Sequence, residues 1–379
     1  MAQAKRAPKK RTSRRRAKAD TRPWWLWAAA VIIGVAALRL AVNWLGLVPV
    51  HFDEAQYWAY GQELAWGHFS KPPLVGWLIA LATWLGGPTT FWLRAGSVLS
   101  HAVVAAVLFL LGRRFWDGRT GFWAAAGYTA APGVTVSAML MTTDPVLMAF
   151  WAVALYAWFR AAEGDGRAWW AVLGAALGLS ILAKYTGIAF AAAALGYGLF
   201  SARGRDWTGT GIAAGVALLV VSPNLAWLAA NEFATIGHVA GDAAPPGSRY
   251  SIGSLAEFLG AQLGVIGPVW FLAIVAALWW RRRWLDDWRM RMLAWQTFAL
   301  LIAMSLLAFW TRAQANWAAP AYVAGSLLAA RIVLAHDWRR ALPAQAAIGA
   351  VAAMALYGAA FAYAALGTQL PRLADPFKK

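Results

Sequence analysis

Residues 24–50 of the chain read WWLWAAAVIIGVAALRLAVNWLGLVPV, and Arg39 is the single charged side chain among them. A second run, residues 208–230 (TGTGIAAGVALLVVSPNLAWLAA), carries no charge. A helix of about 20 apolar residues crosses the hydrocarbon core of a bilayer. Neither run alternates apolar and polar residues as the strands of a membrane barrel do. Because only helical bundles and closed barrels span membranes, the two runs predict an all-α, polytopic membrane protein.

The composition of the whole chain agrees with this prediction. Of its 379 residues 61% are hydrophobic, and 35 glycines raise the apolar share to roughly 70%, whereas an ordinary soluble domain is about 45–50% apolar. Charged residues make up 13%, too few to cover a soluble protein of this size. A soluble two-domain protein and a disordered chain are therefore excluded. The absence of cysteine excludes disulfides, thiolate metal sites and a cysteine nucleophile.

The net charge of +18 is concentrated in the N-terminal tail, where residues 1–22 hold ten of the 34 lysines and arginines. Such a tail could contact RNA or anionic lipid, but positive residues beside a first span also hold a terminus in the cytoplasm. We interpret residues 1–22 as a disordered cytoplasmic tail and expect no nucleic-acid partner. The apolar run after the tail is too long for a signal-peptide core, so we expect it to remain as a span.

Eleven membrane spans are expected from apolar runs of about 15–25 residues. An N-terminus inside the cell puts 25 lysines and arginines in cytoplasmic segments and eight outside, as the positive-inside rule requires. Residues 23–366 would form the transmembrane domain and residues 367–379 a short outer tail. Residues 51–91 would form a large outer loop, in which the apolar run 74–85 suits an interfacial helix. The eleven expected spans are 24–49, 92–111, 120–141, 145–160, 169–183, 186–201, 208–230, 253–280, 292–310, 316–334 and 344–366.

Three acidic residues on the predicted outer face are candidate catalytic groups. Asp53 and Glu54 open the outer loop in HFDEAQYWAYGQELAWG, and Asp144 precedes a proline in MTTDPVLMAFW. The local pattern predicts Asp53 as a helix N-cap with Glu54 in the first turn, and Asp144 as another cap. Carboxylates close to a membrane are costly unless they have a partner or a task. Two of them on one face could serve as base and orienting partner.

Basic residues on the same predicted face form a second candidate group. Snorkelling towards lipid headgroups would explain any one of them. Together they could hold an anionic, phosphorylated ligand. The residues alone leave both interpretations open for Lys71, Arg94, Lys184 and Arg312.

Several motifs together resemble a known family. Residues 51–81, HFDEAQYWAYGQELAWGHFSKPPLVGWLIAL, are similar to the first outer loop of glycosyltransferase family 39, the protein mannosyltransferase and aminoarabinose transferase group. The resemblance continues in order through FWLRAGSVL, TTDPVLMAFWAVALY, GLSILAKYTG, SPNLAWLAANEF, QLGVIGPVWF and QANWAAPAY. An acidic pair, a Lys-Pro-Pro and a Thr-Asp-Pro in this order are specific as a set.

The resemblance implies a C-type glycosyltransferase fold and a sugar transfer from a polyprenyl-phosphate donor to a lipid, glycan or protein acceptor. The transfer would occur at the outer, periplasmic face of the inner membrane and would invert the anomeric carbon. Asp53 would be the catalytic base, with Glu54 and Asp144 as further carboxylates of the catalytic site. Contacts to the donor phosphate are implied for Lys71, Arg94, Lys184 and Arg312, and an acceptor-side position for Tyr57, His68 and Asn316.

The chain departs from the family pattern just before Lys71, where some relatives carry an acidic residue that binds a divalent ion and this chain has Ser70. We therefore assign no metal ligand, although His51 and His68 could supply nitrogen. A rival hypothesis is a secondary transporter or lipid flippase, which would place ionisable residues near the bilayer midplane. A third is a non-catalytic scaffold protein of the membrane.

Overall fold

The structure is a computed structural model that describes residues 22–243, 250–338 and 340–366. Within these ranges every regular element is a helix. In chain order the elements are α1 (Trp24–Trp44), α2 (Phe52–Gln62), α3 (Leu74–Gly86), α4 (Thr90–Phe115), α5 (Gly118–Thr129), α6 (Pro132–Ala138), α7 (Thr143–Glu163), α8 (Ala168–Ala183), η1 (Tyr185–Gly187), α9 (Ile188–Phe200), η2 (Ala202–Gly204), α10 (Trp207–Ala230), α11 (Ala234–Ala243), α12 (Ile252–Ile266), α13 (Pro268–Trp279), η3 (Arg281–Arg283), α14 (Trp288–Trp310), η4 (Ala315–Ala318), α15 (Ala321–Ala335) and α16 (Ala341–Leu366).

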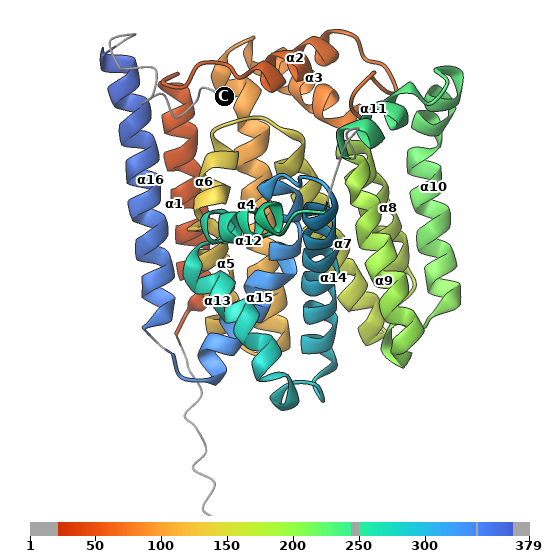
Figure 1. Cartoon of the computed structure of the whole chain (residues 1–379), viewed down its shortest axis with the longest axis vertical. Coiled ribbons are helices and arrows are strands. Elements are labelled where there is room, and N and C mark those ends of the chain that lie inside the picture. The colour runs from red at the N-terminus through yellow and green to blue at the C-terminus, as the bar shows by residue number, and fades with distance from the viewer. Residues whose placement is uncertain (1–21, 244–249, 339, 367–379) are drawn as a thin grey trace, which may run out of the picture.

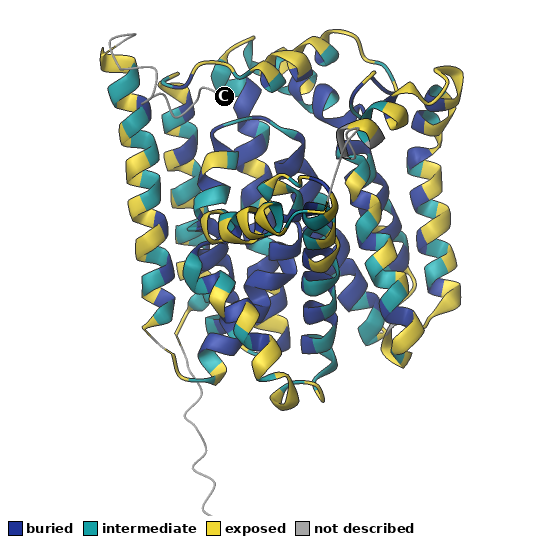
Figure 2. Cartoon of the chain, in the orientation of Figure 1, coloured by how far each residue is buried: buried dark blue, intermediate teal, exposed yellow. Residues whose placement is uncertain are grey.

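The helices form a bundle with α4, α5, α7 and α15 in its middle and with α1, α16 and α10 at its edges (Figures 1 and 2). In α7, 72% of the apolar part is buried, whereas in α1 and in α16 only 11% is. The edge helices are nevertheless as apolar as the central ones. Exposed apolar helix faces of this extent are those of a protein surrounded by lipid, so the polytopic membrane architecture is confirmed.

Within the described residues, six helices are long and apolar enough to cross a membrane, and a bent pair would make a seventh. The expected number of eleven spans is therefore not confirmed. The expected span 253–280 is wrong as a single helix, since the chain bends by 118° between α12 and α13. Gly267 at this corner has a φ of 90°, which favours glycine, and Pro268 begins the next helix.

The expected span 120–141 is also two helices, because α5 ends at Thr129 and α6 begins at Pro132. Proline cannot donate the backbone hydrogen bond that would continue α5. Arg39 of α1 is buried at this break, where it donates to the Thr129 carbonyl oxygen at 2.8 Å and to Thr135 Oγ1 at 3.3 Å. A cation at the negative end of α5 is favourable, so Arg39 has a structural explanation.

The two ends of the bundle differ in structure. Helices α2 and α3 lie across one end, which we call the α2–α3 end (Figure 1). The interfacial helix expected at 74–85 corresponds to α3, Leu74–Gly86. Arginines gather at the opposite end, which we call the arginine end, where Arg114 pairs with Glu163 and Asp165. Of the predicted tails 1–22 and 367–379, residues 1–21 and 367–379 lie outside the described residues.

Candidate active site

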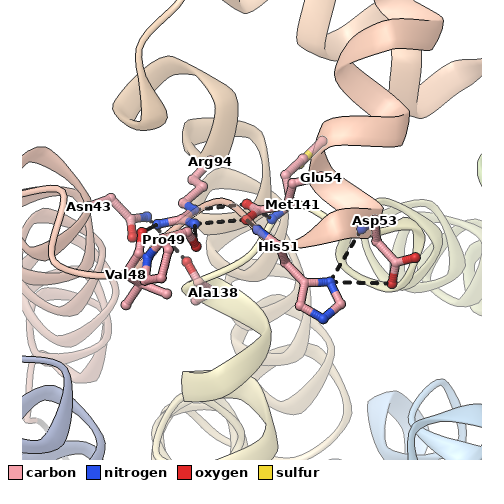
Figure 3. Close-up of polar contacts among 9 residues, drawn as sticks. All are labelled: Asn43, Val48, Pro49, His51, Asp53, Glu54, Arg94, Ala138 and Met141. Carbon is pink, nitrogen blue, oxygen red and sulfur yellow. Dashed lines mark hydrogen bonds and ion pairs between the residues drawn. The ribbon is translucent and has the colours of Figure 1, made fainter. Parts of the chain in front are cut away.

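The first turn of α2 presents two neighbouring carboxylates to different surroundings (Figure 3). The N-cap of this helix is His51 rather than Asp53, which corrects the local prediction. His51 Nδ1 accepts the backbone N–H of Asp53 at 3.3 Å, and Glu54 Oε2 accepts the backbone N–H of His51 at 3.0 Å. This reciprocal capping box fixes the start of α2 and the directions in which Asp53 and Glu54 point.

Glu54 points into the protein, where it forms a two-pronged ion pair with Arg94 of α4. Arg94 donates from Nε to Oε1 at 2.8 Å and from Nη2 to Oε2 at 2.7 Å. It also donates to the carbonyl oxygens of Val48 and Pro49, and the Met141 backbone N–H donates to Glu54 Oε1 at 2.9 Å. Glu54 is 0% and Arg94 1% exposed. Hydrogen bonds within the protein thus use the carboxylate and most of the guanidinium.

Asp53 is held quite differently from its neighbour. Its side chain is 32% exposed, and its Oδ2 lies 3.7 Å from His51 Nδ1. Among the residues that the structure describes, no lysine or arginine pairs with it. The Asp53 carboxylate is therefore open to solvent and to a ligand, unlike that of Glu54.

Asp144 contacts two other predicted site residues, Lys184 and Asn316, and the three form what we call the Asp144 group. It lies in the first turn of α7, and its Oδ1 accepts from Lys184 Nζ at 2.6 Å. Its Oδ2 accepts from Asn316 Nδ2 at 2.6 Å. Lys184 directly follows α8, and Asn316 belongs to η4. The structure thus brings together an acid, a cation and an amide from three distant segments.

Tyr57 lies within the electrostatic range of both Asp53 and Asp144. Its side chain is buried, on the inner side of α2. Burial, and then the negative charges of Asp53 and Asp144, raise the pKa of Tyr57 above its usual value. The phenol therefore stays protonated at neutral pH, and its side chain hydrogen-bonds to Thr143, the residue before Asp144.

The remaining predicted residues lie on the segment after α2 and near η4. His68 is buried and stacks on Tyr60 with 4.0 Å between the ring centroids; burial lowers its pKa, although Glu63 opposes this. Lys71 follows on the same segment, and no ion pair holds its ammonium group within the described residues. Arg312 is mostly exposed and pairs at 3.5 Å with Glu257 of α12, so it is not part of the Asp144 group.

A cavity of about 690 Å³ opens beside Asp144 and Asn316. Its walls come mainly from α6, α12 and α16 and are almost entirely apolar. Two walls of the cavity are tied together by Gln262 of α12, which accepts from the Tyr322 hydroxyl at 2.8 Å and donates to the Ala315 carbonyl oxygen at 3.2 Å. The cavity therefore has the chemistry of a lipid-chain site, with Asp144 and Asn316 among the few polar residues in its walls.

Comparison with known proteins assigns the chain to a family. The model of the dolichyl-phosphate-mannose-protein mannosyltransferase family matches residues 70–227. The lipid A galacturonosyltransferase RgtD of Rhizobium johnstonii is 32% identical over 326 residues, which are 86% of this chain and 69% of that protein. The chain belongs to glycosyltransferase family 39. It is a multi-pass membrane glycosyltransferase.

Other members of family 39 match over shorter stretches. The undecaprenyl phosphate-alpha-4-amino-4-deoxy-L-arabinose arabinosyl transferase 2 of Pseudomonas fluorescens is 31% identical over 181 residues, which cover 42% of this chain and 32% of that protein. These relatives are named as sugar transferases, which does not favour the transporter, flippase or scaffold hypotheses.

The fold is shared with a solved family 39 enzyme. ArnT from Cupriavidus metallidurans, crystallised with undecaprenyl phosphate, superposes with a TM-score of 0.69 at 21% identity, over 90% of this chain and 68% of that one. An oligosaccharyltransferase from Archaeoglobus fulgidus superposes with a TM-score of 0.56 at 14% identity, over 86% of this chain and 53% of that one. The predicted C-type glycosyltransferase fold is therefore confirmed.

The described residues bear on a metal site and on two residues that the sequence analysis did not single out. Within the described ranges, no three histidine, aspartate or glutamate side chains gather as metal ligands, and Ser70 bonds to the Tyr60 hydroxyl at 2.9 Å. Sequence reasoning also missed Asn224 and Tyr185, which bond to each other at 3.3 Å behind the predicted cations. A lone amide in the apolar run 208–230 was the available signal for Asn224.

Proposed function

We propose that this chain transfers a sugar from a polyprenyl-phosphate donor to a lipid acceptor of the cell envelope, with Asp53 as the base. The observation that carries the proposal is the contrast among the three candidate carboxylates. Glu54 is paired with Arg94 and Asp144 with Lys184, whereas Asp53 is partly exposed and has no lysine or arginine partner in the described parts of the chain. Asp53 is thus the carboxylate best able to take a proton.

The chemistry is a single displacement. Asp53 takes the proton of an acceptor hydroxyl while that oxygen forms a bond to the anomeric carbon and the bond from that carbon to the phosphate oxygen breaks. One displacement inverts the configuration at that carbon. The departing phosphate gains negative charge, so cations fixed beside it stabilise the transition state more than the ground state. We assign that role to Lys71 and Lys184.

Two of the predicted roles change in this proposal. Arg94 and Glu54 are assigned to positioning, because each uses its hydrogen-bonding capacity within the protein. Through Met141, three residues before Asp144, the pair also sets the register between α2 and the start of α7. Arg312 is mostly exposed and pairs with Glu257 of α12, and we assign it to the membrane surface.

The apolar cavity beside Asp144 supports a lipid substrate. Its volume of about 690 Å³ and its apolar walls suit part of a polyprenyl or acyl chain. Asp144 and Asn316 both line this cavity, and we place the acceptor hydroxyl between Asn316, Tyr57 and Asp53. The names of the relatives, a lipid A galacturonosyltransferase and an undecaprenyl-phosphate arabinosyl transferase, favour lipid A or a related glycolipid as the acceptor.

The proposed location is the inner membrane, with the α2–α3 end facing the periplasm. The 25-to-eight distribution of lysine and arginine supports this orientation. The test is a comparison of envelope lipids from cells with and without the gene. Loss of one glycosyl group from a lipid, restored by the wild-type chain and not by Asp53→Asn, is the expected result. Identical lipid profiles in the two strains would contradict the proposal.

A further inference from the structure

Lys71 lies on the segment between α2 and α3, which contains no helix or strand. Residues 63–73 are held internally by turn hydrogen bonds, such as the His68 N–H donating to the Lys71 carbonyl oxygen at 3.1 Å. A binding group works well when it is held to within about 0.5 Å of its productive position. These internal bonds hold the shape of the segment, whereas contacts from outside it place the segment, and Lys71 with it, relative to the bundle.

One such contact comes from Asn224 of α10, whose side chain is 0% exposed. Its Nδ2 donates to the Trp66 carbonyl oxygen at 2.7 Å, on the segment that carries Lys71. Its Oδ1 accepts from the Tyr185 hydroxyl at 3.3 Å. Tyr185 directly follows Lys184, so a single amide joins the Lys71 segment to the turn that carries Lys184.

The neighbouring residues of the same segment are held as well. Thr235 of α11 is 1% exposed, and its Oγ1 donates to the His68 carbonyl oxygen at 2.8 Å. Gly67 packs flat against Trp227, where an added Cβ would come within 2.3 Å of the indole. Three consecutive residues, 66–68, are therefore fixed by α10 and by the segment that follows it.

The position of α10 makes these contacts informative. This helix lies at the edge of the bundle, and only 28% of its apolar part is buried (Figure 1). A fully buried amide in such a helix is costly unless both its donor and its acceptor find partners. Asn224 instead donates to the segment that carries Lys71 and accepts from the turn that carries Lys184.

We propose that Asn224 is a positioning residue that sets the separation of Lys71 and Lys184, so that both cations reach one donor phosphate. The inference rests on the proposed function, in which these two lysines contact that phosphate. Thr235 assists by fixing the same segment from the other side. Neither residue touches the donor in this scheme.

The test measures the binding of undecaprenyl phosphate and of undecaprenol, its phosphate-free counterpart, to the purified full chain. Asn224→Leu is expected to weaken undecaprenyl phosphate binding about tenfold, the size of one charge-assisted contact, and to leave undecaprenol binding unchanged. Equal weakening of both lipids would identify a general packing role and overturn the proposal.

Two milder variants keep the inference testable if Asn224→Leu fails to fold. Thr235→Val removes the hydroxyl and keeps the shape, whereas Thr235→Ser keeps the hydroxyl and serves as the matched control. Tyr185→Phe removes the contact to Asn224 Oδ1 alone. We expect Thr235→Val and Tyr185→Phe to weaken undecaprenyl phosphate binding, and Thr235→Ser to bind as the wild type does.

A double-mutant cycle with Lys71→Ala tests the phosphate contact of Lys71 and the positioning role of Asn224 separately. If Asn224 acts through Lys71, most of the effect of Asn224→Leu on undecaprenyl phosphate binding disappears in the Lys71→Ala background. The same factor in both backgrounds would overturn the inference. Normal undecaprenyl phosphate binding by Lys71→Ala would show that Lys71 does not contact the phosphate, against the proposed function. Weak binding by Lys71→Ala, together with normal binding by the Asn224 and Thr235 variants, would contradict the positioning role alone.

Discussion

The two ends of the bundle hold their charges in opposite ways. At the α2–α3 end, Glu54 and Arg94 are at most 1% exposed and make a two-pronged pair. At the arginine end, Arg114 is 36% exposed and shares Glu163 and Asp165 with Arg160 and Arg289. The arginine end holds more of the charge, but the buried Glu54–Arg94 pair at the other end fixes the geometry of the candidate site.

This contrast has a physical origin. A buried pair loses several kcal/mol per ion on leaving water, so it persists only with good geometry and full hydrogen bonding, and the loss of one partner strands the other. An exposed network is screened by solvent and adapts when one member is lost. Substitution of a buried charge at the α2–α3 end should therefore destabilise the protein more than substitution of an exposed charge at the arginine end.

The largest effect is expected from Arg94→Leu, which leaves Glu54 buried without its partner. Removal of one member of a buried pair costs about 3–5 kcal/mol in the free energy of unfolding. Thermal unfolding of the purified protein in detergent measures this loss. The double variant Glu54→Leu with Arg94→Leu is the control, and it should recover part of the stability because no charge stays stranded. A midpoint unchanged in Arg94→Leu would show that the pair is not a structural anchor.

The next largest effect is expected on catalysis rather than on stability. Asp53→Asn keeps the shape of the side chain and the backbone N–H that His51 accepts, but an amide cannot take the acceptor's proton. General-base assistance is worth about 10²–10⁴ in rate, so turnover should fall at least about a hundredfold. Binding of undecaprenyl phosphate and the unfolding midpoint should stay at wild-type values.

The matched control is Glu63→Ala, on the segment that follows α2, which should be milder. Near-normal turnover by Asp53→Asn would contradict the assignment. In that case Asp144, the second carboxylate within reach of Tyr57, would become the candidate base.

Local sequence pattern predicted most helices, because long apolar runs have few alternatives in a membrane. It also contained the signals for the two broken spans, since Pro132 and the Gly267–Pro268 pair interrupt runs that hydropathy alone joins. The expected spans 120–141 and 253–280 were too long because they followed the apolar content and passed over these residues. Proline and glycine were therefore better evidence for helix ends than the mean hydropathy around them.

The pairing within the site could not be derived from the residues alone. Glu54 and Arg94 are 40 positions apart, and nothing local distinguishes a guanidinium that meets a carboxylate from one that meets a phosphate. The resemblance to family 39 selected Asp53, Asp144 and Lys184, but it carried no contact distances. Asn224 was missed because a single amide in an apolar run gives no sign of its partner.

A smaller effect is expected from Lys184→Ala, because Lys184 is 20% exposed and Asp144 keeps Asn316 as a partner. Loss of one charge-assisted contact to the donor phosphate should weaken undecaprenyl phosphate binding roughly ten- to a hundredfold. Asp144→Asn is the control that removes the ion pair and keeps the cation. If undecaprenyl phosphate binding is normal in Lys184→Ala, the lysine pairs with Asp144 and does not contact the phosphate.

The smallest effect is expected at the arginine end, from Arg114→Ala. The side chain bonds to Glu163 and Asp165, yet both acids retain other partners, since Arg289 reaches Glu163 and Arg160 reaches Asp165. Exposed pairs contribute about 0–1 kcal/mol, and solvent screening keeps the loss within that range. Turnover and undecaprenyl phosphate binding should equal those of the wild type, and the change in unfolding midpoint should shrink further in high salt. A loss as large as that of Arg94→Leu would mean that the arginine network is as structural as the buried pair, and the distinction between the two ends would fail.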